Sequence, residues 1–241
     1  IDKLFTPLAF YQEKLILHKA KEIFALSGYT KKKLIHYYNL PAKKIKIAYY
    51  PVDTDYFIPV KKQSDEIILT FTGRVNDPRK NIGLLLRAFK KVNNQFPKSK
   101  LFLIGNILNK MNKQIIESLG IANQVKNLDK LSQKELLPFY QKSSVFIIPS
   151  NQEGLCISGL EALSCGLPIV STRCGGPEEF VKNSYNGYLV KKNNIEDLVK
   201  RITEIISNPS LMKKMGNNSR KLACENFSTH KVSEKILSFV S

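Results

Sequence analysis

Residues 145–171 of the chain read VFIIPSNQEGLCISGLEALSCGLPIVS. The apolar run 145–148 predicts a buried strand, and residues 157–164 combine small and apolar side chains in a pattern typical of a buried helix. The apolar run 168–171 predicts the next strand. A strand, a helix and a strand joined by short loops form the βαβ unit of a parallel sheet.

The same alternation continues on both sides of this unit. Apolar strands that alternate with helices indicate a parallel sheet covered on both faces, so the sequence predicts an α/β fold with a Rossmann-like, doubly wound parallel sheet. Ser132 and Glu135 have the spacing of a capping box at the start of one helix. Further strands are expected at 67–72, 101–104, 125–128 and 187–190. Further helices are expected at 82–96, 111–119, 132–140 and 177–181, and from 195 onward with breaks near Pro209 and Gly216.

The loops that follow these strands carry most of the residues suited to binding. In a parallel sheet covered on both faces, ligands bind beyond the carboxyl ends of the strands. Five loops meet this description and are rich in Gly, Asn, Arg and Glu, namely 73–80, 105–109, 128–132, 150–158 and 172–176. We therefore expect the binding site at this edge of the sheet.

Two glutamates flank the start of the helix at 157–164. Glu153 lies in the preceding loop and Glu161 lies about two turns into the helix. On chemistry alone, a plain loop residue and an exposed helix residue are equally good interpretations. The small and apolar neighbours of Glu161 favour a site, because burying an unpaired carboxylate is costly. The free backbone N–H groups that would suit a phosphate are those of Leu155, Cys156, Ile157 and Ser158.

A second group of residues follows the first strand of the sheet. Gly73 permits a close approach of the backbone, and Arg74 and Lys80 place two cations at the same edge. Arginine offers a planar fork to phosphate oxygens and lysine a point charge. A solvated surface turn is the alternative for this segment, and its position at the predicted binding edge favours the site.

Three groups of residues occur together in one known family. They are Gly73-Arg74 with Arg79-Lys80-Asn81-Ile82, the Pro-Ser, Glu-Gly, Glu-Ala and Cys-Gly-Leu-Pro-Ile-Val-Ser-Thr elements of 149–172, and Gly-Gly-Pro-Glu at 175–178. In this combination the chain, from about Ser27 to its C-terminus, resembles glycosyltransferase family 4, whose members are retaining enzymes with the GT-B fold. The resemblance implies the C-terminal, donor-binding half of that fold with a short remnant of the N-terminal domain.

The resemblance also implies a role for each candidate residue. Arg74 and Lys80 would hold the diphosphate of a nucleotide sugar and offset the charge on the leaving group, while Glu153 would bind hydroxyls of the sugar. These three form the implied catalytic group, and Glu161 would bind the ribose. The other implied donor-binding positions are Gly73, Gly154, Leu155, Cys156, Ile157 and Ser158. The 128–132 loop would face the base, and no metal or other cofactor is expected.

The implied reaction is the retaining transfer of a sugar from a nucleotide-diphosphate sugar, UDP- or GDP-linked, to a glycan or lipid-linked acceptor in polysaccharide or glycolipid synthesis. Two alternatives stay open: a stand-alone sugar-nucleotide-binding module and a GT-B-fold epimerase. A second strand–helix unit encoded upstream would argue against the module, and the segment 154–161 favours transfer over epimerisation.

The domain organisation follows from the same resemblance. We expect a remnant of the acceptor-side domain at 1–50, with helices at 15–24 and 31–38 and a strand at 45–49, and a linker at 51–62. The donor-binding domain is expected at 63–226 and a C-terminal helix at 227–241. Since the first residue is Ile and not Met, we expect an upstream segment, and little or no transfer by these 241 residues alone.

Composition limits the partners. The chain has 38 Lys and Arg against 20 Asp and Glu, a net charge of +18, but no basic stripe interleaved with aromatic residues, so nucleic acid is not expected as a partner. The charge is compatible with peripheral contact at an anionic membrane. No signal peptide or membrane span is evident, so a cytoplasmic location is expected. The four cysteines show no zinc-ligand spacing, so no structural zinc is expected. Asp53-Thr54-Asp55 has the spacing of a metal-binding motif, but its place in the linker argues against that role.

Overall fold

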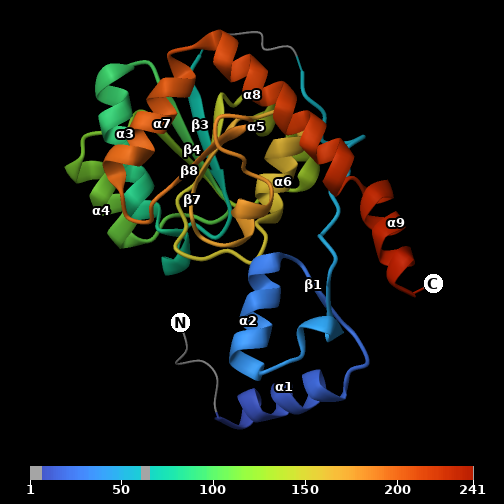
Figure 1. The fold of residues 1–241 in the computed structure, drawn as a ribbon. Coiled ribbons are helices and arrows are strands. Elements are labelled where there is room, and N and C mark those ends of the chain that lie inside the picture. The colour runs from blue at the N-terminus through green and yellow to red at the C-terminus, as the bar shows by residue number, and fades with distance from the viewer. Residues whose placement is uncertain (1–6, 61–65, 241) are drawn as a thin grey trace.

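A computed structural model describes residues 7–60 and 66–240 of the chain. Six strands form one parallel sheet, in the order β5-β4-β3-β6-β7-β8. Helices cover both of its faces (Figure 1). This is the strand order of the Rossmann fold, so the prediction of a doubly wound α/β fold is confirmed. The strands are β3 (Ile68–Thr72), β4 (Lys100–Ile104), β5 (Val125–Leu128), β6 (Val145–Ile148), β7 (Ile169–Thr172) and β8 (Gly187–Val190).

The central strands are apolar throughout because side chains on both faces of the sheet are buried. All four residues of β6 are fully buried, and they alternate between two cores. Val145 and Ile147 belong to the core under α3, α4 and α7, whereas Phe146 and Ile148 belong to the core under α5 and α6. The helices are α3 (Ile82–Gln95), α4 (Lys110–Ser118), α5 (Gln133–Lys142), α6 (Ile157–Ser164), α7 (Ile195–Ile206), α8 (Pro209–Leu222) and α9 (Thr229–Val240).

Most of the predicted elements are confirmed within one or two residues. The strands at 125–128, 145–148 and 187–190 and the helix at 157–164 have the predicted bounds, and the capping box of Ser132 and Glu135 is present. The expected break near Gly216 is wrong, because α8 continues through this residue. Gly216 instead lets α8 approach the loop before β7, since a Cβ atom there would lie 2.4 Å from the carbonyl oxygen of Gly166. The helix expected at 177–181 is a single 3-10 turn, η3 (Gly176–Glu179).

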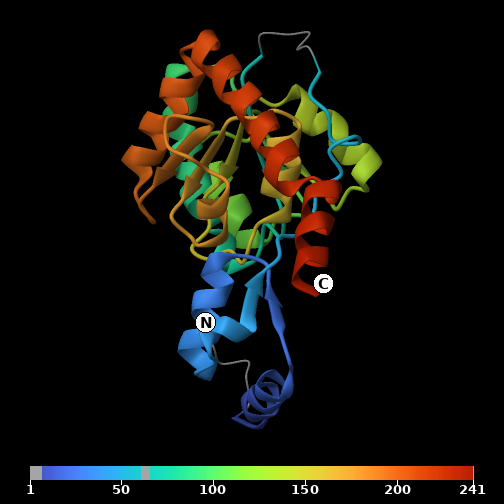
Figure 2. The same cartoon turned by 45° about the vertical axis from the view of Figure 1, so that its right-hand side comes forward.

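Residues 7–50, which we call the N-terminal unit, lie beyond the carboxyl edge of the sheet (Figure 2). The unit consists of α1 (Pro7–Lys19), β1 (Ile23–Ala25), α2 (Gly28–Tyr38), the turn η1 (Ala42–Lys44) and β2 (Ile45–Ile47). The helix expected at 15–24 is confirmed only as far as Lys19, because Ile23 and Phe24 lie outside the helix and pair with β2 in a parallel two-stranded sheet. Pairing with a distant strand has overridden the local helical pattern.

The segment expected to be a linker packs along the sheet domain instead of spanning open space. The N–H of Val52 donates to the carbonyl of Phe227 at 2.8 Å, and Phe57 is buried. The Arg220 guanidinium donates to the carbonyls of Thr54, Phe57 and Ser164. The division at 50, 62 and 226 stays a prediction, and residues 61–65, where linker and donor domain were expected to meet, lie outside the described residues.

The last helix contacts the N-terminal unit. The rings of Phe24 and Phe239 stack with centroids 6.0 Å apart, and the ammonium of Lys235 lies 5.0 Å from the centre of the Tyr49 ring. Figure 1 shows α9 descending beside this unit. In the part of the chain that the structure covers, no helix has the length and apolar character needed to cross a membrane.

We expect Gly187→Ala to destabilise the sheet. A Cβ atom at this position would lie 1.8 Å from the carbonyl oxygen of Ile169, so β7 and β8 would have to separate. Overpacking of this kind should lower the free energy of unfolding by about 3 kcal/mol, measured by urea denaturation. Gly120→Ala is the control, because Gly120 has a positive φ of 63° but open space around it, and it should cost only about 1 kcal/mol. Equal losses in the two variants would contradict the steric explanation.

Candidate functional site

The candidate site lies where the strand order of the sheet reverses, between β3 and β6. Gly73 directly follows β3, and the loop 150–155, which we call the Glu153 loop, follows β6. Loops from two neighbouring strands diverge at such a switch point and leave a crevice for a ligand. The sheet therefore brings together both groups of residues that the sequence analysis singled out.

The loops after β3 and β4 pack directly on each other. The N–H of Gly73 donates to the carbonyl of Ile104 at 2.8 Å. A Cβ atom at Gly105, which has a φ of +146°, would lie 2.0 Å from the carbonyl oxygen of Gly73. Glycine at this position lets the two backbones meet without a side chain between them.

Asp77 organises the cations of the first loop. Its carboxylate accepts from the Arg79 guanidinium at 2.7 and 3.1 Å and lies 3.1 Å from the Arg74 guanidinium. Hydrogen bonds from Arg79 hold the pKa of Asp77 down to about 2, so this carboxyl is ionised at neutral pH. The side chain of Arg74 is 68% exposed, so a ligand can reach it.

Lys80 and Glu153 form a mostly buried ion pair. The ammonium of Lys80 lies 2.7 and 2.8 Å from the two carboxylate oxygens of Glu153, and the side chains are only 16% and 8% exposed. The hydroxyl of Ser150 donates a third hydrogen bond to this carboxylate at 2.6 Å. The backbone supports the pair, because the N–H of Asn151 donates to the carbonyl of Arg79 at 2.7 Å.

The backbone of Glu153 is held by the loop after β7. Its N–H donates to the carbonyl of Cys174 at 2.8 Å, and its carbonyl accepts from the N–H of Gly176 at 2.9 Å. Gly176 lies so close that a Cβ atom there would be 2.4 Å from the Cα of Leu155. Three loops thus fix the position of one carboxylate.

The first turn of α6 opens into the same region. The residue before the helix, Cys156, has a left-handed φ of 73° and provides no side-chain cap. The first N–H groups of a helix have no acceptor within the helix and carry its partial positive charge, so they suit an anion. The hydroxyl of Ser158 is directed elsewhere and donates to the carbonyl of Thr72 at 3.0 Å. Burial raises the pKa of the Cys156 thiol to about 12, which keeps it neutral.

Glu161 lies within α6, and a tyrosine side chain holds its carboxylate. Its carboxylate accepts from the hydroxyl of Tyr140, a fully buried residue of α5, at 2.8 Å. Burial raises the pKa of Glu161, although the hydrogen bond from Tyr140 opposes the shift. Glu161 is therefore not the exposed helix residue that the alternative interpretation supposed.

The structure brings some of the predicted residues into contact and adds others. Lys80 and Glu153 touch, Arg74 pairs with Asp77 of the same loop as Lys80, and Glu161 contacts the buried Tyr140. The sequence analysis missed Asp77, Ser150 and Tyr140. The spacing of three residues between Ser150 and Glu153 was a usable signal, whereas Tyr140 meets Glu161 only through the tertiary fold.

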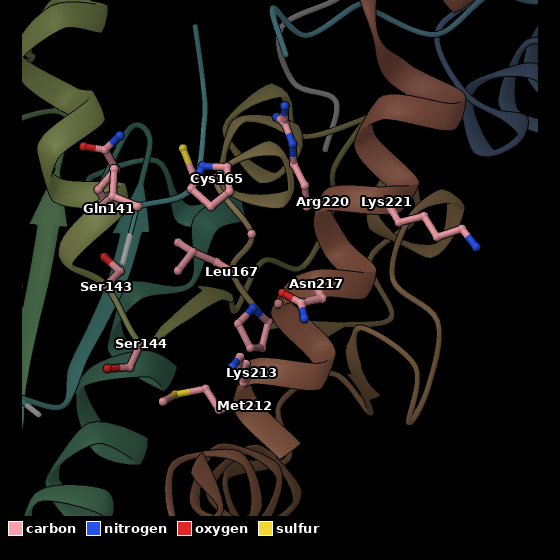
Figure 3. Close-up of a pocket in the computed structure, with 15 residues that line it drawn as sticks. Gln141, Ser143, Ser144, Cys165, Leu167, Met212, Lys213, Asn217, Arg220 and Lys221 are labelled. Carbon is pink, nitrogen blue, oxygen red and sulfur yellow. The ribbon is translucent and has the colours of Figure 1, made fainter. Parts of the chain in front are cut away.

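A separate pocket lies at the amino ends of the strands, opposite the candidate site. It has a volume of about 700 Å³ and is lined by residues that precede β6 and β7, such as Ser143 and Pro168, and by α8 residues such as Asn217 (Figure 3). It therefore plays no part in the predicted site. Asp53, from the rejected metal motif, caps a turn by accepting from the N–H groups of Asp55 and Tyr56 at 3.0 and 2.9 Å.

The chain is similar to known glycosyltransferases. The family described as glycosyl transferases group 1 matches residues 53–222. An uncharacterized glycosyltransferase of Methanocaldococcus jannaschii is 34% identical over 149 residues, which cover 61% of this chain and 40% of that protein. The capsular polysaccharide biosynthesis glycosyltransferase CapM of Staphylococcus aureus is 24% identical over 242 residues, covering 94% of this chain and 63% of that protein. The chain thus spans 40% to 63% of the length of these curated relatives.

Solved structures show the same fold. HepE of Anabaena, crystallised in complex with UDP, matches with a TM-score of 0.87 at 20% identity over 99% of this chain and 68% of that chain. Sucrose-phosphate synthase of Thermosynechococcus elongatus matches with a TM-score of 0.85 at 20% identity over 98% of this chain and 62% of that chain. The sheet domain and the N-terminal unit are therefore arranged as part of a larger known fold.

We expect the Lys80–Glu153 pair to behave as one unit in unfolding experiments. Lys80→Met would leave a buried carboxylate unpaired and should lower the free energy of unfolding by about 3 kcal/mol, measured in urea. The double variant Lys80→Met with Glu153→Gln removes both charges and should regain most of that loss. Additive losses from the two substitutions would contradict the coupling.

We expect Glu161→Gln to stabilise the protein at pH 7. A carboxyl group whose folded pKa is raised above its ordinary value of 4.5 contributes stability below that value and loses it as pH rises through the folded pKa. The neutral glutamine avoids this loss and can still accept from Tyr140. The stability difference, measured by urea denaturation across pH 4 to 8, should shrink as the pH falls. A pH-independent difference would contradict the burial of Glu161.

Proposed function

Because the chain belongs to the glycosyl transferases group 1 family, we propose that it forms the donor-binding part of a retaining glycosyltransferase that uses a nucleotide-diphosphate sugar. The observation that carries the proposal is the Lys80–Glu153 pair beside the uncapped start of α6, at the switch point of the sheet. This arrangement offers cations and free N–H groups to a diphosphate, and a carboxylate to sugar hydroxyls. The division into an acceptor-side unit at 1–50, a linker at 51–62 and a donor domain at 63–226 is part of the same proposal.

In the proposed complex the diphosphate lies between Arg74, Lys80 and the first turn of α6. When the bond between the anomeric carbon and the diphosphate breaks, negative charge grows on the leaving oxygen. A guanidinium, an ammonium and a helix N-terminus placed there would stabilise that charge, and they would do so without reorganising during the reaction. Asp77 would act indirectly, by keeping Arg74 at the edge of the crevice.

Glu153 is proposed to bind the donor sugar and not to act as a general acid or base. Its carboxylate already accepts from Lys80 and Ser150, which keeps it oriented. An ionised carboxylate can accept further hydrogen bonds from two neighbouring hydroxyls of a sugar. Glu161 is proposed to bind the ribose of the nucleotide in the same way, with Tyr140 fixing its orientation.

The donor nucleotide and the acceptor are proposed by analogy with relatives. HepE was crystallised with UDP and with UDP-glucose, which makes UDP the first nucleotide to test, with GDP as the second. CapM is a capsular polysaccharide enzyme, which supports a glycan or lipid-linked acceptor. We also propose a cytoplasmic location with peripheral contact at an anionic membrane, a setting that a net charge of +18 would favour. We propose that sugar transfer itself requires a chain as long as those of these relatives.

We expect the chain to bind one nucleoside diphosphate in preference when titrated with UDP, GDP, ADP and CMP by calorimetry. Lys80→Ala and Arg74→Ala should each weaken that binding by roughly 10- to 100-fold, because each removes about 1.5–3 kcal/mol of charge-assisted hydrogen bonding. Arg74→Ala is the cleaner test, since this exposed side chain contributes little to folding.

Lys142 provides a matched control. It is exposed at the C-terminal end of α5, near the amino end of β6 and away from the candidate site. Lys142→Ala should leave the dissociation constant unchanged. As an independent check, a nucleotide at about 100 times its dissociation constant should add about 2.7 kcal/mol to the free energy of unfolding. If no diphosphate binds, or if Lys142→Ala weakens binding as much as Arg74→Ala, the proposed donor site is wrong.

A further inference from the structure

The N-terminal unit is fastened to the sheet domain by the carboxylate of Glu179. One oxygen of this carboxylate accepts from the N–H of Gly28 at 2.7 Å, and the other accepts from the hydroxyl of Tyr49 at 3.0 Å. Gly28 is the first residue of α2, so the negative charge lies at the positive end of a helix. A single side chain of the sheet domain thus joins the start of α2 to the segment that follows β2.

The start of α2 makes two more contacts with the sheet domain. The buried hydroxyl of Ser27, which caps α2 by accepting from the N–H of Thr30, donates to the carbonyl of Gly154 at 2.6 Å. The ring of Tyr29 lies against Gly175, where a Cβ atom would be only 2.6 Å from the ring. Both partners belong to loops that surround the candidate site.

These contacts lead directly to Glu153. Glu179 ends the turn η3, and the first residue of that turn, Gly176, donates its N–H to the carbonyl of Glu153 at 2.9 Å. On the other side, Gly154 follows Glu153 in the chain and is the residue that Ser27 holds. The N-terminal unit therefore supports the chain on two sides of Glu153, directly at Gly154 and, through Glu179, at the turn that begins with Gly176.

We propose that Glu179 is a positioning residue that couples docking of the N-terminal unit to the order of the Glu153 loop. When the unit is docked, the loop holds Glu153 against Lys80. When the unit is released, the loop loses the hydrogen bond from Ser27 to Gly154, and the turn that holds the Glu153 carbonyl loses its bonds to Gly28 and Tyr49. Because such coupling is reciprocal, a ligand that binds the ordered loop also strengthens docking of the unit. The identity of that ligand rests on the proposed function, whereas the coupling itself is a property of the free protein.

Hydrogen–deuterium exchange of the full chain without ligand tests the coupling. Glu179→Ala removes both hydrogen bonds to the N-terminal unit, and we expect about tenfold faster exchange in α2 and also in residues 150–158. Glu178→Gln is the matched control. Glu178 lies on the same turn but accepts from the N–H of Gly175 and faces Arg173 at 3.8 Å, and glutamine keeps an acceptor there. This control should leave exchange in α2 unchanged.

A second variant approaches the same contact from the N-terminal unit. A Cβ atom at Gly28 would lie 2.9 Å from a carboxylate oxygen of Glu179, so Gly28→Ala should push the carboxylate away while every residue of the sheet domain stays the same. We expect the same faster exchange in residues 150–158. Faster exchange in α2 without any change in 150–158 would overturn the coupling, and unchanged exchange in both segments would overturn the role of Glu179.

UDP binding adds a third readout and separates this inference from the proposed function. In the unaltered chain, saturating UDP should slow exchange in α2, and Gly28→Ala should weaken UDP binding severalfold with Lys80 and Arg74 intact. If neither UDP nor GDP binds the unaltered chain, the proposed donor fails, and the exchange in residues 150–158 of the two variants still decides the coupling. If UDP binds both variants with unchanged affinity, the coupling is wrong although the donor site stands.

Discussion

The parallel pairing of β3 with β6 is the constraint on which the candidate site depends. Leu69 is in register with Val145, which brings the loop containing Lys80 next to the loop containing Glu153. Any shift of this register would separate the ammonium from the carboxylate and leave two charges buried without partners. The sheet therefore fixes both the geometry of the site and its electrostatic balance.

An element could be predicted from the sequence when its own residues determine its structure, and could not when a distant partner does. The bounds of β6 were predictable because all four of its side chains are buried, which leaves an uninterrupted apolar run. Arg74, Lys80, Glu153 and Glu161 could be singled out because they follow or flank elements of that kind. The end of the helix expected at 15–24 was misplaced because Ile23–Ala25 is a strand only through its partner Ile45–Ile47. The roles of Tyr140 and Glu179 were hidden for the same reason, since their partners are distant in the sequence.

The two glutamates beside α6 differ in how their charge is accommodated. Glu153 is paired with an ammonium and supported by Ser150, whereas Glu161 has a tyrosine hydroxyl and a buried setting that favours its neutral form. Glu153 is thus stabilised by an opposite charge, whereas the burial of Glu161 lowers the stability of the fold. A group retained under such conditions is typical of a binding site, where stability and function compete.

The contact between α9 and the N-terminal unit has a consequence for synthesis on the ribosome. Residues 7–50 leave the ribosome before the groups that hold them, namely Gly154, Glu179 and the aromatic ring of Phe239, which lie later in the chain. The sheet can form as its strands emerge, whereas residues 7–50 gain their contact with α9 only after Phe239 has been made. Contacts between such distant segments form slowly, so residues 7–50 stay without these partners, and are exposed to other contacts, until Phe239 has emerged.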